Sequence, residues 1–288
     1  RPAPRAPLVM AIFKQITIVG LGLIGGSLGM ALRRWRLAAK VVGLSRTAAT
    51  IRHAKARGAI DEGTTDARHA VRDADIVVLA LPVDLIAPQG KRLARLMRRG
   101  SVLTDVGSTK GSIVKALSRL PRGIAFVGAH PLAGSEQRGI ASARADLFDG
   151  SICLIARTAL TNRRALSRVQ ALWKPLVRRV MTVSPKDHDR LLAHLSHLPH
   201  LIAFSLMNAT PRRALTLAPR SFLEATRVAH SDPDLWDDIL RDNRPAVLVS
   251  LRAFERECGR MRRLLQRANS SALKQRLRHA QRLRASLR

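Results

Sequence analysis

The chain is poor in aromatic residues and in acidic ones. Phe and Trp make up 3% of its 288 residues, Tyr is absent, and 20 acidic residues stand against 51 Lys and Arg, a formal net charge of +31. Such a surplus is compatible with a polyanionic partner, an anionic substrate or a coding bias toward Arg. Nucleic-acid binding by stacking needs aromatic residues interleaved with basic ones, and that pattern is missing. We therefore do not expect nucleic acid to be the main partner.

Cysteines are scarce and long apolar runs are missing. Cys153 and Cys258 lie far apart, so the sequence has neither a disulfide framework nor a metal-ligand spacing. No apolar run reaches the roughly 18 residues of a membrane span, and residues 1–7 lack the apolar core of a signal peptide. We expect a cytoplasmic protein. With 46% hydrophobic residues, the chain can build a sizeable core, and its length favours two domains.

A glycine-rich turn, Gly20-Leu21-Gly22-Leu23-Ile24-Gly25, follows the apolar run Ile16–Val19 and opens a helical pattern that runs to Arg34. The three glycines allow, in order, a tight turn, close approach of a pyrophosphate, and packing of helix on strand. The helix N-terminus favours an anion. We expect the backbone of Gly20, Gly22, Leu23, Ile24 and Gly25 to bind a dinucleotide; the alternative is a tight turn without a ligand.

The cofactor is suggested by the residues after the next apolar run, Val41–Leu44. An NAD site usually carries an acid there for the ribose hydroxyls. This chain has Ser45 and Arg46 instead, and no acid before Asp61. Because a guanidinium binds phosphate in bidentate fashion, the pair favours NADP over NAD. Alternatively, Arg46 is one more solvated charge.

Alternating strand and helix patterns predict an α/β, Rossmann-like, doubly wound and mostly parallel sheet, followed by an all-helical domain. The predicted strands are Ile16–Val19, Val41–Leu44, Ile76–Leu81, Val102–Asp105, Ala125–Val127, Ile152–Ile155 and Val180–Val183. From Lys186 onward only helical patterns appear, and the last one, from about Ala268, is basic and expected to pack on a partner subunit or to fray. The predicted divisions are a flexible tail (1–13), a dinucleotide-binding domain (14–184) and a helical substrate and dimerisation domain (185–288).

Polar residues follow several predicted strands, where ligands of such sheets bind. Leu81 and Pro82 end one strand and are candidates for cofactor contact. Asp105 ends another and leads into Ser108, Thr109 and Lys110. Ser108 is a candidate active-site residue; alternatively, Ser108 or Thr109 merely caps the helix that begins near Gly111.

Histidines are the candidate acid–base groups. His130 directly follows the predicted strand Ala125–Val127, and its ordinary pKa suits a general base, although a structural histidine is the alternative. Glu136, six residues on, is a candidate for orienting a ligand. Farther along, His197 and His200 lie one helical turn apart. No Glu or Cys joins these histidines at a zinc-site spacing, so we expect ligand contacts and no metal.

Several segments together carry a resemblance to a known family. They are Gly20–Ser27, Asp105–Lys110, His130–Glu136, His188-Asp189, Ser196–His200, Glu224–Arg227 and Ser231–Trp236. In this order and spacing, from about residue 15 to about 260, the chain resembles the prephenate and arogenate dehydrogenases of tyrosine biosynthesis. The resemblance implies NAD(P)-dependent oxidative decarboxylation of prephenate to 4-hydroxyphenylpyruvate or of arogenate to tyrosine, by a homodimer paired through helical domains.

The resemblance also implies roles for single residues. His130 would accept the substrate hydroxyl proton and stabilise the charge that develops as hydride departs. Ser108 would hydrogen-bond the same hydroxyl, and Arg227 would hold a substrate carboxylate. His200 and His197 would contact the substrate's side-chain end, and Glu136 would act as a gate.

The chain departs from the family at one position and leaves two alternatives open. Glu224 stands where an Asp often precedes Arg227 by three residues, and we expect no room for a fused regulatory module. One alternative is a β-hydroxy-acid dehydrogenase, which would need a lysine site in the helical domain, and neither Lys186 nor Lys274 sits in a persuasive setting. The other is a non-catalytic basic protein that binds NADP or nucleic acid.

Overall fold

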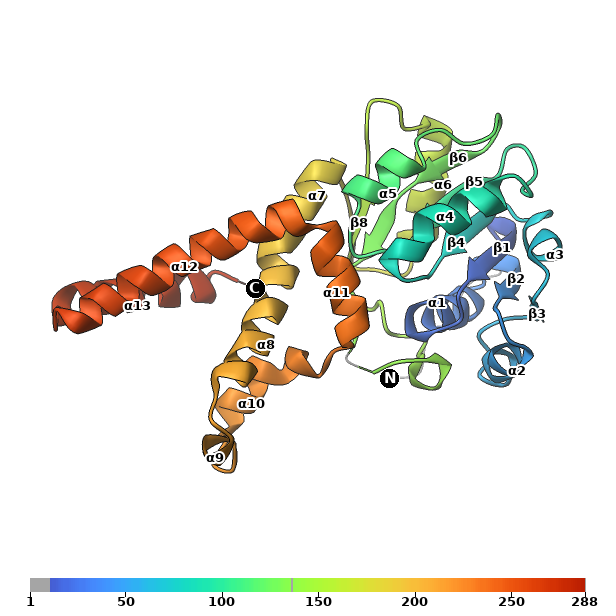
Figure 1. The fold of residues 1–288 in the computed structure, drawn as a ribbon. Coiled ribbons are helices and arrows are strands. Elements are labelled where there is room, and N and C mark those ends of the chain that lie inside the picture. The colour runs from blue at the N-terminus through green and yellow to red at the C-terminus, as the bar shows by residue number, and fades with distance from the viewer. Residues whose placement is uncertain (1–10, 136, 288) are drawn as a thin grey trace. The chain divides into compact units, whose positions relative to one another are not determined.

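The computed structural model describes residues 11–135 and 137–287 (Figure 1). Its contacts divide the chain into two compact units, and the boundary along the sequence lies between Asn243 and Arg244. The first holds both sheets and most of the helices, and the second is a helical hairpin.

A six-stranded parallel sheet forms the centre of the first unit, in the order β3-β2-β1-β4-β5-β6. Its strands are β1 (Phe13–Val19), β2 (Ala38–Leu44), β3 (Glu62–Thr64), β4 (Ile76–Leu79), β5 (Val102–Asp105) and β6 (Ala125–Val127). β1 pairs with both β2 and β4, and Val19 lies level with Leu44 and Leu79 at the carboxyl edge. Because the strand order reverses at β1, ligands are expected at this edge. The predicted doubly wound sheet is confirmed.

Helices cover both faces of this sheet and create two cores. They are α1 (Leu23–Arg34), α2 (Ala48–Ala56), α3 (Ala67–Val71), α4 (Val83–Ala94), α5 (Gly111–Ala116) and α6 (Arg163–Trp173). One core joins β1 to α1 and α6 through Ile16, Leu28 and Trp173. The other packs β4 and α4 around Val77 and Ile86. Burial on both faces explains why the strands are continuous apolar runs.

A second, three-stranded sheet was not expected. It consists of β7 (Ala129–Pro131), β8 (Ile152–Ala156) and β9 (Arg179–Val183), with β7 antiparallel to β8 and β8 parallel to β9. His130 is therefore the middle residue of a strand, not part of a loop after one. β7 and β3 have three residues each, too few to show a period of two, so the sequence pattern misses both. The strand predicted to reach Leu81 ends at Leu79.

Helices follow from residue 185 to the end of the first unit. They are α7 (Pro185–Leu192), the π-helical turn η2 (Ala193–His197), α8 (Leu198–Ala209), α9 (Arg212–Leu215), α10 (Arg220–Thr226), the 3₁₀ turn η3 (Arg227–His230) and α11 (Pro233–Asp242). A further 3₁₀ turn, η1 (Ile140–Ser142), lies earlier, between β7 and β8. Ser184 and Asp232 cap α7 and α11, each followed by a first-turn proline. α7 contacts α5, and α11 contacts α4. Contacts thus group these helices with the sheet, although the sequence changes character near residue 184.

The second unit contains α12 (Arg244–Gln266) and α13 (Ser270–Ala285). Asn269 caps α13, and Arg276 of α13 binds Glu257 of α12 at 2.5 Å. Apolar side chains such as Phe254, Leu277 and Leu283 remain exposed on it. No helix among the described residues is long and apolar enough to cross a membrane.

Candidate functional site

The glycine turn is built so that two glycines are packed against backbone and one faces open space. A Cβ on Gly25 would lie 1.9 Å from the Gly20 carbonyl oxygen, and one on Gly20, whose φ is +94°, would lie 2.2 Å from the Ala80 oxygen. A Cβ on Gly22 would meet nothing within 4 Å. Gly22 is also the N-cap of α1 and provides no side-chain cap. The first N–H groups of α1, at half-buried Leu23 and Ile24, thus adjoin open space, which suits a pyrophosphate.

The other predicted cofactor residues lie at the same edge of the sheet. Ser45 and Arg46 follow β2, whose last carbonyl, at Leu44, accepts a hydrogen bond from Gly20 N at 3.0 Å. Leu81 follows β4 and packs beside Gly20, and Pro82 is the N-cap of α4. The fold therefore brings the predicted cofactor residues together.

The first acid after β2 is engaged elsewhere. Asp61 binds Arg33 at 2.9 Å and accepts the Val41 amide at 2.7 Å. The Arg46 side chain is exposed. The residues of this edge therefore fit a dinucleotide, and Asp61 is not one of those that face it.

A buried ion pair ties the loop after β5 to the start of β7. Lys110 Nζ and Asp105 Oδ2 are 2.5 Å apart, and both side chains are fully buried. Lys110 Nζ also donates to the carbonyls of Gly107 and Thr109 at 2.8 Å each, and Asp105 Oδ1 accepts the Ala129 amide. The pair therefore fixes the loop that carries Ser108 relative to the strand that carries His130. The sequence singled out both residues without giving them this role.

The helix that follows Ser108 is capped from elsewhere in the chain. The Asp189 carboxylate accepts the amides of Lys110 and Gly111, each at 2.8 Å. Neither Ser108 nor Thr109 caps α5, so the cap alternative for them is wrong. Ser108 is half-buried, and its side chain is not needed to begin the helix.

Four histidines from four elements, His130, His188, His197 and His200, form what we call the histidine cluster. His130 Nδ1 lies 3.0 Å from Nε2 of the fully buried His188, and His188 Nδ1 lies 2.8 Å from Asp189 Oδ1. The sequence placed His188 among histidines expected to face an anionic substrate, and it gave Asp189 no role beyond its place in the family resemblance. It gave no sign that His188 contacts His130, because 58 residues separate the two.

His197 and His200 both contact the ring of one tryptophan. His200 stacks on Trp236 with ring centroids 3.6 Å apart, and His197 meets the ring edge-on at 6.1 Å. Asn243 Nδ2 donates to His197 Nδ1 at 3.0 Å and to the Asp189 carbonyl at 2.8 Å. His197 Nε2 is buried, and the backbone of Ser108 is the hydrogen-bond partner that acts on this imidazole from the loop after β5.

Burial keeps the cluster uncharged. It lowers the pKa of His130 well below its ordinary value, and the charges of His188, Lys110 and His197 add to the effect. Burial also lowers the pKa of His197 to about 4 and the pKa values of His188 and His200. His130 is therefore a neutral imidazole near pH 7, as a hydrogen-bond acceptor or base must be.

Two predicted substrate residues, Arg227 and Glu136, do not belong to the histidine cluster. Arg227 begins η3, and its charge adds to the burial that lowers the pKa of His200. Glu224 pairs with Arg220 at 2.8 Å. Glu136 lies outside the described residues, so its predicted role as a gate stays a prediction. The adjoining loop is tied to α11 by an ion pair of 2.7 Å between Arg138 and Asp232.

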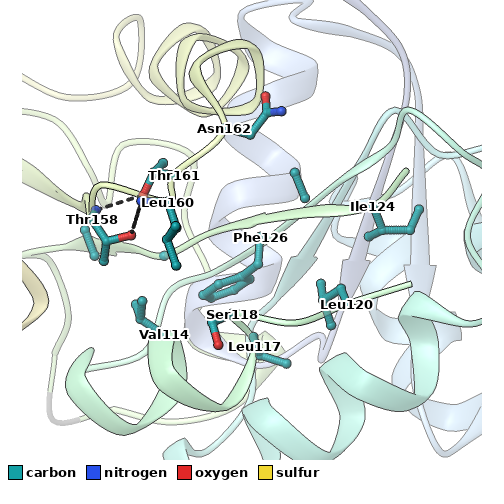
Figure 2. Close-up of a pocket in the computed structure, with 13 residues that line it drawn as sticks. Val114, Leu117, Ser118, Leu120, Ile124, Phe126, Thr158, Leu160, Thr161 and Asn162 are labelled. Carbon is teal, nitrogen blue, oxygen red and sulfur yellow. Dashed lines mark hydrogen bonds between the residues drawn. The ribbon is translucent and has the colours of Figure 1, made fainter. Parts of the chain in front are cut away.

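The cavity shown in Figure 2 is separate from these residues. It measures about 200 Å³ and is lined by apolar side chains of α5 and β6, including Val114 and Phe126, and by the turn from Thr158 to Asn162. None of its lining residues belongs to the glycine turn or to the histidine cluster. The candidate active site is therefore at the carboxyl edge of the large sheet, where these two features are found.

Comparison with known families gives matches over most of the chain. The family described as "Prephenate dehydrogenase, nucleotide-binding domain" matches residues 28–182, and "Prephenate dehydrogenase, dimerization domain" matches residues 184–279. The first match begins after the glycine turn and includes Ser108 and His130. The second includes the other three histidines of the cluster and Arg227.

Individual relatives agree with these matches. The chain is 33% identical to a cyclohexadienyl dehydrogenase of Zymomonas mobilis over 96% of its own length and 97% of the relative's. A crystal structure of prephenate dehydrogenase from Aquifex aeolicus, in complex with hydroxyphenyl propionate and NAD+, is similar with a TM-score of 0.89 and 30% identity, covering 98% of this chain and 100% of the other. Synechocystis arogenate dehydrogenase is similar with a TM-score of 0.81 and 30% identity, covering 94% and 99%.

Proposed function

The chain belongs to the prephenate dehydrogenase family of nicotinamide-dependent oxidoreductases, and we propose that it converts prephenate to 4-hydroxyphenylpyruvate, arogenate to tyrosine, or both. The observation that carries this proposal is the geometry around His130. A neutral histidine is held by buried hydrogen bonds, on a strand fixed to the loop of Ser108, at the sheet edge that carries the glycine turn.

The substrate is a cyclohexadiene with a ring carboxylate and a hydroxyl on the opposite carbon. Bound nicotinamide supplies the acceptor for the hydride that leaves the hydroxyl-bearing carbon. As that hydride departs, His130 accepts a hydrogen bond from the hydroxyl and stabilises the positive charge on its carbon. Ser108 holds the same hydroxyl. The ring carboxylate leaves as carbon dioxide, and its electron pair completes the aromatic ring, so the site needs mainly to orient groups and stabilise charge.

The helical elements supply the contacts for the rest of the substrate. Arg227 binds a carboxylate, because a guanidinium matches carboxylate geometry. His200 and His197, which lie around Trp236, contact the side-chain end, where prephenate has a keto group and arogenate an amino group. Glu136 acts as a gate or polar partner.

The alternative of a β-hydroxy-acid dehydrogenase finds little support in the lysines. Lys186 is exposed on the first turn of α7, and Lys274 belongs to the helical hairpin of the second unit. The buried Lys110 is engaged by Asp105 and two carbonyls. The three N–H groups of the Lys110 ammonium are thus all engaged within the protein.

The finer proposals concern the cofactor and the assembly. Ser45 and Arg46 favour NADP, because a guanidinium can bind the charged 2′-phosphate that NAD lacks. The match of residues 184–279 to a dimerisation domain, together with exposed apolar residues on α12 and α13, supports a homodimer. Light scattering on the purified protein should give twice the mass of the chain, and a monomeric mass would contradict this assignment.

One steady-state experiment tests the activity. The purified protein is assayed with prephenate and arogenate, each crossed with NAD and NADP, following absorbance of the reduced nicotinamide and release of carbon dioxide. We expect equal amounts of both products with at least one pair. If no pair is turned over by folded protein that binds a nicotinamide cofactor, the proposed function is wrong.

A variant tests the substrate arginine. Arg227→Ala should raise the KM of the cyclohexadiene by about tenfold to a hundredfold, because a charged hydrogen bond contributes roughly 1.5–3 kcal/mol. The KM of the cofactor should change by less than about twofold. The exposed Arg220 provides a matched control, since Arg220→Ala should alter neither constant. Equal effects of Arg227→Ala on both constants would remove the assignment.

A further inference from the structure

A continuous hydrogen-bonded chain leads away from the candidate base. It runs from His130 Nδ1 to His188 Nε2 at 3.0 Å and from His188 Nδ1 to Asp189 Oδ1 at 2.8 Å. We propose that His188 and Asp189 are positioning residues, which hold His130 in one tautomer and share the positive charge that it takes on during turnover. This inference rests on the proposed function for the role of His130.

The direction of each hydrogen bond follows from the carboxylate. An ionised carboxylate only accepts, so His188 Nδ1 carries the proton in its bond to Asp189. Nε2 of neutral His188 must then accept, and His130 Nδ1 must donate to it. The remaining nitrogen of His130, Nε2, is left without a proton. Asp189 thus determines, through His188, which nitrogen of His130 is the base.

The surroundings keep Asp189 ionised. Burial raises the pKa of its carboxyl, but hydrogen bonds from His188 and from the amides of Lys110 and Gly111 outweigh burial and hold the pKa below its ordinary value. The carboxylate therefore has two connections. It fixes the start of α5, directly after the Ser108 loop, and it ends the chain that begins at His130.

The proposed reaction needs charge sharing more than proton release. Carbon dioxide and a hydride leave the substrate, and its hydroxyl keeps a proton as the phenol hydroxyl, so no proton is lost overall. His130 carries a partial positive charge only while the ring carbon is electron-poor. His188 and Asp189 can stabilise that charge without carrying a proton to solvent, and a hydrogen-bonded chain through the fully buried His188 suits this task.

Nuclear magnetic resonance tests the tautomer without any substrate. In protein labelled with ¹⁵N-histidine, the two ring nitrogens differ in shift according to which one is protonated, and His130→Asn identifies the signals of His130. We expect a protonated Nδ1 and an unprotonated Nε2 at neutral pH. A proton on Nε2 would overturn the proposal whatever the activity of the protein.

Two variants separate the tautomer from the charge. In His188→Gln, the amide oxygen can still accept from His130 Nδ1, but it cannot share a positive charge. We expect kcat to fall about tenfold to a hundredfold, with both KM values within about twofold. In Asp189→Asn, the amide donates to His188 and reverses both tautomers, so kcat should fall by about a thousandfold and the His130 proton should move to Nε2, as happens when a triad aspartate becomes asparagine.

Matched controls exclude a general loss of structure. His194→Gln changes an exposed histidine two turns along the same helical segment, and Asp237→Asn changes an exposed aspartate of α11. Both should keep kcat within twofold, and all four variants should bind reduced cofactor with unchanged affinity. An unchanged kcat in His188→Gln would overturn the inference while leaving the proposed function intact. If the unmodified protein turns over neither substrate, the proposed function fails, and the resonance experiment still decides the tautomer.

Discussion

The glycine turn and the histidine cluster perform adjacent tasks by opposite means. The turn is made of backbone in contact with backbone, with Gly25 packed against the Gly20 carbonyl and Gly20 against Ala80. The cluster is made of side chains, whose hydrogen bonds span 58 residues between His130 and His188 and 46 between His197 and Asn243. The glycine turn has no room for added atoms at Gly20 or Gly25, whereas the histidine cluster depends on which of its atoms donate and accept hydrogen bonds.

This difference predicts how each region fails. An added methyl group at the turn displaces backbone, and the whole βα unit must move, because interiors are close-packed. A changed side chain in the cluster leaves the backbone in place and alters charge or protonation. Loss of folding should therefore follow changes in the turn, and loss of chemistry should follow changes in the cluster.

The largest effect is expected at Gly25. In Gly25→Ala, the new Cβ would lie 1.9 Å from a carbonyl oxygen that cannot give way, so the free energy of unfolding should fall by roughly 4 kcal/mol or more. Gly22→Ala is the matched control, because its Cβ meets nothing within 4 Å, and it should cost within about 1 kcal/mol. Urea titrations measure both. Similar losses in the two variants would contradict the backbone description of the turn.

His130→Asn tests the opposite behaviour in the cluster. Removing the base should lower kcat by roughly 10²–10⁴-fold, while cofactor affinity and the thermal midpoint stay nearly unchanged. Rapid-quench and steady-state kinetics measure the first, and fluorescence titration with reduced cofactor measures the second. Turnover at the original rate would remove His130 from the chemistry.

Lys110→Met tests a case that lies between the turn and the cluster, because the ion pair of Lys110 with Asp105 is made by side chains but fixes the backbone of a loop. The substitution leaves a buried carboxylate without its cation, so we expect a loss of about 3 kcal/mol in the free energy of unfolding. Lys115→Met, at an exposed position of α5, is the control and should be neutral within about 0.5 kcal/mol. A stable Lys110→Met protein with normal kinetics would mean that the pair does not position Ser108 and His130.

The turn could be predicted from the sequence because its signals are local. Apolar run, glycines and helix pattern are adjacent, and the order β1, turn, α1 follows from them. The parallel sheet was predictable for the same reason, since buried strands are continuous Val, Ile and Leu runs. The small second sheet was not, because β7 has three residues and pairs with a strand more than twenty residues away.

The cluster was predictable only in part. His130, His197 and His200 were found from position, spacing and resemblance, but their partners were not. No local pattern shows that Asp189 caps α5, that His188 contacts His130, or that Asn243 binds His197. Such bonds depend on α7 and α11 packing against α5 and α4, which is a property of the folded chain.

The pH dependence should separate the cluster from an exposed histidine. Because burial and the neighbouring charges of His188, Lys110 and His197 lower the pKa of His130, the base stays neutral well below pH 6.5. The rate should therefore be nearly equal at pH 6 and pH 7.5, whereas a histidine with its ordinary pKa would keep about a quarter of its neutral form at pH 6. A fall in kcat centred at pH 6.5 would contradict the buried description.

The free energy of unfolding should also depend on pH, and it should fall as the pH falls. The pKa of folded His197, about 4, is below that of an unfolded histidine, so the unfolded state binds protons first as the pH falls. The stability present above pH 6.5 is lost progressively between pH 6.5 and 4. In His197→Gln, denaturant titrations over this range should show a smaller loss than in the unmodified protein, and an identical loss would show that His197 does not contribute.

The smallest effect is expected at Arg46, which belongs to neither the glycine turn nor the histidine cluster. It is an exposed side chain beside a backbone site, so its contribution to phosphate binding is screened by solvent and should amount to about tenfold. Arg46→Ala should lower kcat/KM for NADP by that factor and leave NAD unchanged, whereas Arg52→Ala, on exposed α2, should change neither. In the proposed site the backbone of the turn would contact the diphosphate that both cofactors share, so the choice between them would fall to a side chain next to it. A constant ratio of the two cofactors in Arg46→Ala would assign that choice to another side chain and remove the basis for preferring NADP.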